Sequence, residues 1–265
     1  MSFTKEKRAQ YGDELYEALK AGKTIDPLTD RESDITIEDA YHISLHMVER
    51  RVAAGDKIVG KKIGVTSKAV QDMLNVHQPD FGFITNEMWF ENAETISISA
   101  NKLIQPRAEG EIAFKLKKDL VGPGVTEKDV LEATECVMPC FEIVDSRIHN
   151  WQIKIQDTVS DNASCGVFVL GENEVDPRDI DLPNAQMKVF KNGTLISEGL
   201  GSAVQGNPLT AVAWLANTLG EFGIPFKAGE IILSGSLVPL EPVGPGDVMT
   251  LEIEGMGTAA VTFGS

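Results

Sequence analysis

Cysteine is scarce in this 265-residue chain, and long apolar runs are missing. Cys136, Cys140 and Cys165 are an odd number without a CxxC pair. This pattern does not indicate a disulfide framework and predicts buried thiols in a reducing compartment. No stretch approaches the length of a membrane span, and residues 1–7 are charged and lack an apolar signal region. We therefore expect a soluble cytoplasmic protein without a membrane partner.

Positively charged residues are also few. The chain has 24 lysines and arginines against 40 acidic residues, a formal net charge of −16. This balance argues against nucleic acid or an anionic membrane surface as a partner. No Ser-His-Asp triad can be assigned, and His42 and His46 share a helix face without ligands at metal-site spacing. An anionic small-molecule substrate would therefore need a metal, a lysine or an arginine.

Three glutamates carry the strongest signal that is present. Glu109 and Glu111 begin a predicted strand in which Ile112 starts the opposite, apolar face. Residues i and i+2 of a strand point to the same side, roughly 6–7 Å apart. Glu142 lies in the apolar run 140–144, where a charge is costly unless it is compensated. These features predict one shared cation, and carboxylate ligands favour Mg²⁺, Mn²⁺ or Ca²⁺ over zinc.

Simpler interpretations remain open for each candidate residue. Glu109 and Glu111 are also typical of a solvated strand edge, and Arg107 could pair with one of them. Lys61 and Lys62 in the glycine-flanked segment 60–66 would face opposite sides of a strand, and the local pattern favours two solvated lysines. Three further alternatives concern loops: Asp80 as an ordinary turn residue, residues 157–166 as a hydrogen-bonding loop, and the same residues as a plain connection.

The order of predicted elements indicates an α+β protein. The N-terminal part, about 1–75, reads as mainly helical and the body, about 76–265, as β-rich. We predict helices over 5–21, from a capping box at 36–39 to Gly55, and after Ser67 with Ala69, Val70, Met73 and Leu74 as its apolar face. Asp26 to Ser33 reads as a polar loop, and Asn192-Gly193 predicts a hairpin. Without repeats or a linker, residues 1–265 are predicted to form a single catalytic domain.

Taken together, five segments resemble the hydratase and decarboxylase group of the fumarylacetoacetate hydrolase superfamily. They are residues 60–66, 77–82, 105–111, 157–166 and 234–237, and they follow one another in family order. The resemblance implies a mixed β-roll with peripheral helices. By position it makes Glu109, Glu111 and Glu142 the ligands of Mg²⁺ or Mn²⁺. It also implies catalytic roles for Lys62, Asp80 and Ser164, and substrate contacts for the set Lys62, Ser164, Ser236 and Leu237.

The same resemblance implies an activity. The context of residues 164–166 and 234–237 looks more hydratase-like than decarboxylase-like. The expected reaction is metal-dependent addition of water to 2-hydroxypenta-2,4-dienoate (2-oxopent-4-enoate) in aromatic meta-cleavage catabolism, giving 4-hydroxy-2-oxopentanoate. The alternatives are 2-oxo-3-hexenedioate (4-oxalocrotonate) decarboxylation and, outside the family, a non-catalytic acidic binding module. A 2-oxo or 2-hydroxy-dienoic acid substrate, a homo-oligomer (pentamer or decamer) and association with the related decarboxylase are also implied.

Overall fold

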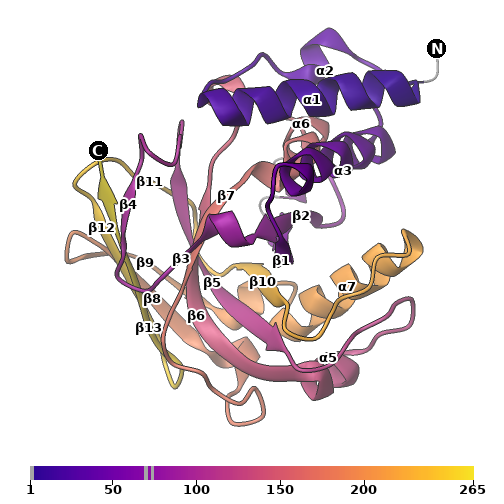
Figure 1. Cartoon of the computed structure of the whole chain (residues 1–265). Helices are drawn as coiled ribbons and strands as arrows, with labels where there is room; N and C mark the ends of the chain where they lie inside the picture. Colours follow the sequence, from indigo (N-terminus) through magenta and orange to yellow (C-terminus); the bar gives the residue numbers. More distant parts are fainter. Residues whose placement is uncertain (1–2, 69–70, 73–74) are drawn as a thin grey trace.

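The computed structural model describes residues 3–68, 71–72 and 75–265 (Figure 1). The predicted helix after Ser67 falls largely outside these residues. The described helices are α1 (Lys5–Ala21), α2 (Leu28–Arg31), α3 (Ile37–Ala53), α5 (Glu127–Ala133), α6 (Ile155–Ser160) and α7 (Pro208–Glu221). The first seven strands are β1 (Ile58–Gly64), β2 (Asp80–Thr85), β3 (Trp89–Phe90), β4 (Thr95–Ser97), β5 (Arg107–Leu116), β6 (Thr134–Val144) and β7 (Cys165–Leu170). They are followed by β8 (Gln186–Lys191), β9 (Thr194–Leu200), β10 (Ile231–Ser236), β11 (Glu241–Pro242), β12 (Val248–Ile253) and β13 (Gly257–Gly264).

The N-terminal helices form where the local signals predict them. Thr36 and Asp39 make a reciprocal capping box at the start of α3, because each side chain accepts a hydrogen bond from the other's backbone N–H. The predicted polar loop 26–33 is wrong in one respect, since it contains the short helix α2. Thr29 in α2 donates from its N–H and its hydroxyl to Asp157 of α6, at 3.0 and 2.7 Å. These buried bonds attach the helical part to the body.

Two sheets form the body within the described residues. The larger has the strand order β2-β1-β10-β5-β6-β7-β3, with β11 also paired to β5, and the smaller has the order β4-β13-β12-β8-β9. Asn192 and Gly193, with φ of 53° and 79°, connect β8 to β9, as the sequence predicts. In Figure 1 the helices α1–α3 gather with α6 at one end of the strands, while α5 and α7 lie towards the other end. The α+β prediction is confirmed.

The two faces of the larger sheet have different surroundings. Ile112, Phe114 and Phe141 point into the main hydrophobic core, whereas Ala113 and Leu233 point to the opposite face, into a smaller apolar cluster. Because Lys62 pairs with Leu233 and Leu233 pairs with Ala113, the Lys62 side chain lies on this second face. The second face of the larger sheet therefore carries the candidate site residue Lys62.

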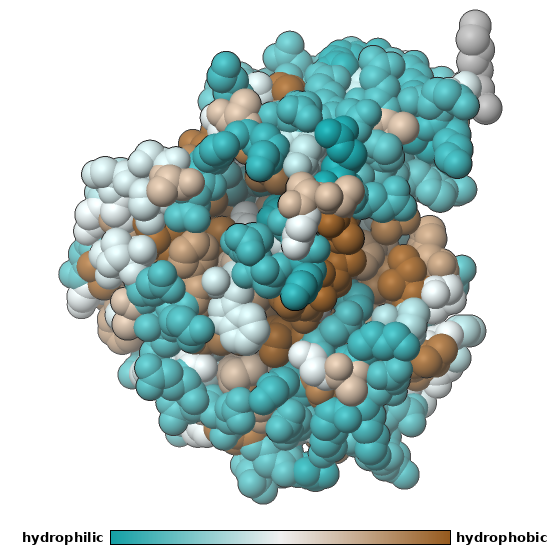
Figure 2. Space-filling model, viewed as in Figure 1, coloured by the Kyte–Doolittle hydropathy of each residue, from teal (hydrophilic) through white to brown (hydrophobic). Residues whose placement is uncertain are grey.

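Polar and apolar side chains are distributed unevenly on the molecular surface. Figure 2 shows a mainly hydrophilic surface over the N-terminal helices, with apolar side chains in the hollow between them and the strands. Among the described residues, no helix combines the length and the apolar character needed to cross a membrane.

Candidate metal centre

Strand pairing brings the three glutamates together. Glu109 and Glu111 lie on one face of β5, and Glu142 of β6 is the direct partner of Glu109 in the antiparallel register. One carboxylate oxygen from each residue lies within 4.8 Å of the others. The solvated-edge interpretation is wrong, because β5 lies between β10 and β6 inside the sheet. Arg107 does not join the cluster: its guanidinium stacks on the Trp151 ring at 4.7 Å.

Burial makes this cluster suitable for a cation. Glu111 and Glu142 are fully buried and Glu109 is half-buried. In the described part of the chain, Glu111 Oε1 and both carboxylate oxygens of Glu142 have no hydrogen-bond partner. Buried carboxylate oxygens without partners are costly, and hard divalent cations bind such oxygens. The donor set therefore fits a divalent metal ion.

The pKa shifts of the three glutamates also indicate a site for a cation. Burial, followed by the charge of Glu142, raises the pKa of Glu109 to about 8. The pKa of Glu111 is raised by burial and by the charges of Glu142 and Glu109. Burial also raises the pKa of Glu142, although the neighbouring Lys62 opposes this shift. Ionised together, the three carboxylates repel one another, and a bound cation would relieve that repulsion.

Lys62 is the cation nearest to the glutamates in the described structure. Its Nζ lies 3.3 Å from Glu142 Oε1, an ion pair without hydrogen-bond geometry. Burial disfavours the charged ammonium, but the charges of Glu142, Asp80 and Glu109 outweigh burial and raise the pKa of Lys62. The lysine is therefore held protonated, and the interpretation of a solvated Lys62 is wrong.

Lys61 is buried as well, on the opposite face of β1. Its ammonium pairs with Glu230 and lies 5.2 Å from the centre of the Phe226 ring. The predicted opposite orientation of the two lysines is confirmed, whereas the expectation that both are solvated fails. An apolar face with a partner acid accommodates the second charge.

Asp80 begins strand β2 and is buried, so the ordinary-turn interpretation is wrong. It is the ladder partner of Gly64. A Cβ added at Gly64 would overlap Asp80 Oδ1 and would lie 3.2 Å from Lys62 Nζ, which places both side chains beside the same small residue. Burial raises the pKa of Asp80 and the charge of Lys62 lowers it. Among the described atoms, Asp80 Oδ1 has no hydrogen-bond partner.

A backbone N–H near the end of β10 binds one of the three glutamates. Gly235 donates its N–H to Glu111 Oε2 at 2.8 Å, with a φ of 106° and Thr66 packed where a Cβ would lie. Ser236 is the ladder partner of Glu111, but its hydroxyl donates to Val238 O at 2.6 Å. Leu237 packs into the main hydrophobic core. Substrate contacts by Ser236 and Leu237 stay predictions.

The polar segment 157–166 is not an exposed connection. It forms the end of α6 and the 3-10 turn η3 (Asn162–Ser164), and residues 157–165 are buried. Asn162 bonds both backbone polar groups of Phe83, and Ser164 Oγ lies 3.0 Å from Thr158 Oγ1. The hydrogen-bonding interpretation is therefore the correct one, and the catalytic role of Ser164 stays a prediction.

Sequence reasoning missed two hydroxyls. Ser160 Oγ and Ser234 Oγ are buried and have no hydrogen-bond partner within the described structure. Their only signal in the sequence is that each lies in a polar run, 157–166 for Ser160 and Ser-Gly-Ser for Ser234. The cysteines are free and buried, as predicted. Burial raises the pKa of the Cys165 thiol to about 12, which makes it a poor nucleophile.

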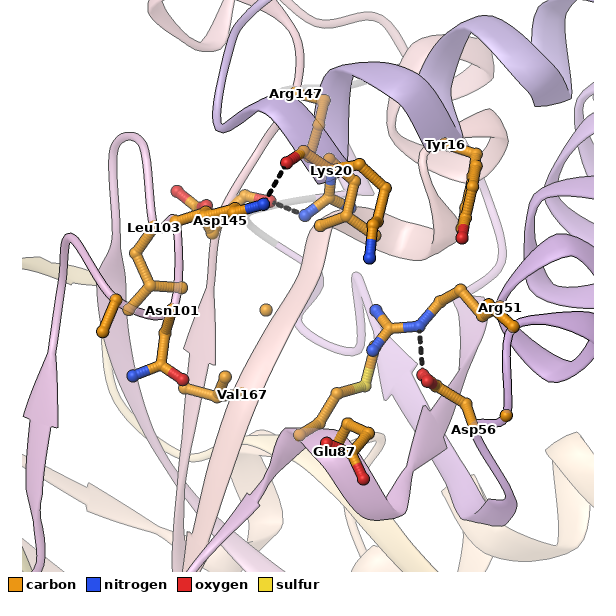
Figure 3. Close-up of a pocket in the computed structure, with 17 residues that line it drawn as sticks. Tyr16, Lys20, Arg51, Asp56, Glu87, Asn101, Leu103, Asp145, Arg147 and Val167 are labelled. Carbon is orange, nitrogen blue, oxygen red and sulfur yellow. Dashed lines mark hydrogen bonds and ion pairs between the residues drawn. The ribbon is translucent and has the colours of Figure 1, made fainter.

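A pocket of about 500 Å³ lies away from the acidic cluster, between the N-terminal helices and the body. Figure 3 shows Lys20 of α1 and Arg51 of α3 pointing towards each other across it. Asp145 and Arg147, which follow β6, form part of its wall, whereas the lining includes neither the three glutamates nor Lys62. This pocket is thus separate from the predicted metal ligands.

Carboxylates and an ammonium buried on one face of a mixed sheet are features of enzymes that use a divalent metal on a small anionic molecule. The chain belongs to the fumarylacetoacetate hydrolase family, because the family model "Fumarylacetoacetate (FAA) hydrolase C-terminal" matches residues 57–263.

Named relatives span nearly the whole chain. It is 66% identical over 252 residues to 2-hydroxyhexa-2,4-dienoate hydratase of Comamonas testosteroni, covering 95% of this chain and 96% of that protein. It is also 66% identical over 215 residues to 2-hydroxypent-2,4-dienoate hydratase of Pseudomonas putida, covering 81% and 96%. Among solved structures, 4-oxalocrotonate decarboxylase from Pseudomonas putida G7, complexed with magnesium and adipate, has a TM-score of 0.95 at 34% identity and covers 99% of both chains. The relatives confirm the family resemblance.

Proposed function

We propose that this protein is a metal-dependent hydro-lyase that adds water to 2-hydroxypenta-2,4-dienoate to give 4-hydroxy-2-oxopentanoate. The observation that carries the proposal is the buried cluster of Glu109, Glu111, Glu142 and Lys62. The substrate class is supported by the two hydratases that are 66% identical to this chain. A non-catalytic binding module leaves these costly buried charges unexplained.

We propose Mg²⁺ or Mn²⁺ as the ion, held by the three glutamates. Oxygen ligation favours these hard cations, and a solved relative carries magnesium. A bound divalent ion supplies Lewis-acid stabilisation to a developing oxyanion. The Gly235 N–H contributes by fixing one oxygen of Glu111, which leaves the other oxygen for the ion.

Lys62 and Asp80 are the proposed groups for proton transfer and for orienting the substrate and the water. The reaction first moves the proton of the 2-hydroxyl to C5, which leaves a 2-oxo-3-enoate, and water then adds its oxygen to C4 and a proton to C3. The ammonium of Lys62 is held protonated and can bind the substrate's negative oxygens. Asp80 has a raised pKa and an oxygen without a partner among the described residues, so we propose it as the group that exchanges a proton with the substrate or the water. Ser164, Ser236 and Leu237 remain the proposed substrate contacts.

The test uses purified protein with 2-hydroxypenta-2,4-dienoate, with Mg²⁺ or Mn²⁺ and with chelator. We expect 4-hydroxy-2-oxopentanoate that carries oxygen from labelled water at C4, and no product with chelator. A product without the solvent label, or turnover that survives complete chelation, would refute the proposal.

A second candidate is decarboxylation of 2-oxo-3-hexenedioate, favoured by the close match to the decarboxylase structure. Both reactions need the same metal and a similar dienolate, so the metal ligands cannot separate them. The diacid, assayed under identical conditions, should release little CO₂. Rapid CO₂ release without hydration of the monoacid would reverse the assignment and leave the metal site intact.

We also propose that residues 1–265 act as one catalytic domain in the cytoplasm and assemble as a homo-oligomer, a pentamer or a decamer. Ile58 and Trp89, which line a second pocket of about 480 Å³, are 40% and 41% exposed, and such apolar surface favours association. Light scattering after gel filtration should give the mass of the assembly. Co-elution with the related decarboxylase would test the proposed association, and a monomer at micromolar concentration would contradict the homo-oligomer.

A further inference from the structure

The turn Asn162–Ser164, referred to below as the left-handed turn, has a backbone that ordinary residues rarely adopt. Asn162, Ala163 and Ser164 have φ values of 53°, 51° and 52°. A left-handed conformation is unfavourable for residues with a Cβ, and runs of it are rarer than single residues. Such conformations persist where the surroundings hold them, and they concentrate at functional sites.

One end of the turn is attached to strand β2. The Asn162 side chain accepts from Phe83 N at 2.8 Å and donates to Phe83 O at 2.9 Å, so its amide takes the place of a strand partner. A Cβ added at Gly82 would lie 2.5 Å from Asn162 O, so the turn rests directly on this glycine. Gly82 is the ladder partner of Lys62. The turn therefore abuts the strand pair at the level of the buried lysine.

A buried guanidinium holds both ends of the turn. Arg147 donates from Nη2 to Asp161 O at 2.7 Å, on one side, and from Nη1 to Cys165 O at 2.9 Å, on the other. Its Nε and its backbone N–H donate to the two carboxylate oxygens of Asp161, at 2.5 and 2.8 Å. Arg147 and Asp161 are 1% and 0% exposed. A short helical connection does not need a clamp of this kind, so the clamp indicates a defined position for the turn.

The residues that the clamp positions lie close to the acidic cluster. Ser164 O accepts from Asp145 N at 2.8 Å, three residues after Glu142 in the chain. Cys165 pairs with Val144, and both Glu142 and Lys62 influence the pKa of its thiol. The turn thus lies between β2, which carries Asp80, and the β6–β7 pair, which carries Glu142.

We propose that Arg147, Asp161 and Asn162 are positioning residues that hold the left-handed turn against Gly82, and that the turn sets where a 2-oxo acid lies relative to Lys62. The inference rests on the proposed function for its ligand class. These residues act through the turn and need not touch the substrate. Metal binding, which depends on β5 and β6, is expected to be independent of them.

The test variant is Asn162→Gly, because glycine accepts the positive φ without cost and only the attachment to Phe83 is lost. The matched control is Asn192→Gly in the β8–β9 hairpin. Asn192 has the same φ of 53° and also makes two side-chain bonds, to Asp247 and Val248 N. Three quantities are measured for each: the Kd of Mn²⁺, the Kd of the unreactive acid 2-oxopentanoate with Mn²⁺ present, and kcat/KM for the dienoate.

For Asn162→Gly we expect about a tenfold weaker 2-oxopentanoate affinity and a similar loss of kcat/KM, with the Kd of Mn²⁺ unchanged. Asn192→Gly should leave all three quantities unchanged. Arg147→Lys is the second variant, because lysine keeps the charge beside Asp161 but cannot reach both carbonyl oxygens. It should show the same selective loss.

Asn162→Gly and Arg147→Lys variants that match the control would overturn the inference. So would a parallel loss of Mn²⁺ affinity, or failure of both variants to fold, since either result would make the network structural. A wild-type protein that binds Mn²⁺ and 2-oxopentanoate but hydrates no dienoate would refute the proposed function alone. The affinity for 2-oxopentanoate would still decide the positioning role.

Discussion

Glu142→Gln separates the charge of the proposed metal ligand from its volume. Glu142 is 0% exposed, and both its oxygens lack hydrogen-bond partners among the described residues. Removing one partner of a buried pair of opposite charges costs about 3–5 kcal/mol, and the proposed contact between Glu142 and the metal ion is such a pair. Since a tenfold change in Kd corresponds to about 1.4 kcal/mol, the full loss would be two to three and a half powers of ten. A glutamine oxygen can still ligate, so we expect the lower end, about a hundredfold.

The expected loss has a consequence for thermal stability. A metal at 100 times its Kd stabilises the wild-type protein by about 2.7 kcal/mol. At the same concentration, the variant would be half-saturated and would gain only about 0.4 kcal/mol. For a chain of this length, the metal-induced rise in Tm should fall from roughly 5–10 °C to about 1 °C.

The assay is a Mn²⁺ titration followed by melting with and without the metal. Glu135→Gln is the matched control, because Glu135 lies on the same strand, is exposed, and pairs with Lys115 at 3.6 Å. This control should bind Mn²⁺ as the wild type does. Turnover of Glu142→Gln should fall together with its affinity and should recover in part at high metal concentration. Wild-type affinity and an unchanged rise in Tm in Glu142→Gln would refute the ligand role.

Three further predictions concern neighbouring groups. Lys62→Met should lower kcat by at least about a hundredfold. Lys61→Met removes an ion pair on the other face of β1, so it should lower the Tm but keep the turnover of the folded fraction. Equal small effects of the two substitutions on kcat would contradict this prediction. The pKa of Glu109 is raised from 4.5 to about 8 by burial and by neighbouring charge, so the folded metal-free protein keeps a proton that the unfolded chain releases. Its free energy of unfolding should therefore fall as pH rises through this interval and should recover with Mn²⁺, and pH-independent melting with chelator would argue against it. Gly235→Ala should lower the free energy of unfolding by about 1–3 kcal/mol and weaken Mn²⁺ binding, because its φ is 106° and the Cβ would overlap Thr66; unchanged melting and metal titration would count against this.

Interactions between residues close in the sequence determined several secondary-structure elements of this protein and part of its candidate metal site. The capping box at Thr36 and Asp39, the Asn192-Gly193 hairpin and the shared face of Glu109 and Glu111 follow from interactions between residues a few positions apart. Such short-range interactions can be recognised in the sequence, so these secondary-structure elements and the pair Glu109 and Glu111 of the acidic cluster were predictable. The apolar run 140–144 also identified Glu142 as a residue whose charge needs compensation.

Only the tertiary structure decided how these pieces meet. The pairing of Glu109 with Glu142 depends on the register between β5 and β6, and no local signal specifies it. The burial of both Lys61 and Lys62 has the same origin, because a strand inside a sheet has no solvent face once both sides are covered. The left-handed turn was hidden for a related reason: Arg147 holds it from a distant position, and the backbone of Asn162 departs from its usual preference because buried partners outweigh local propensity.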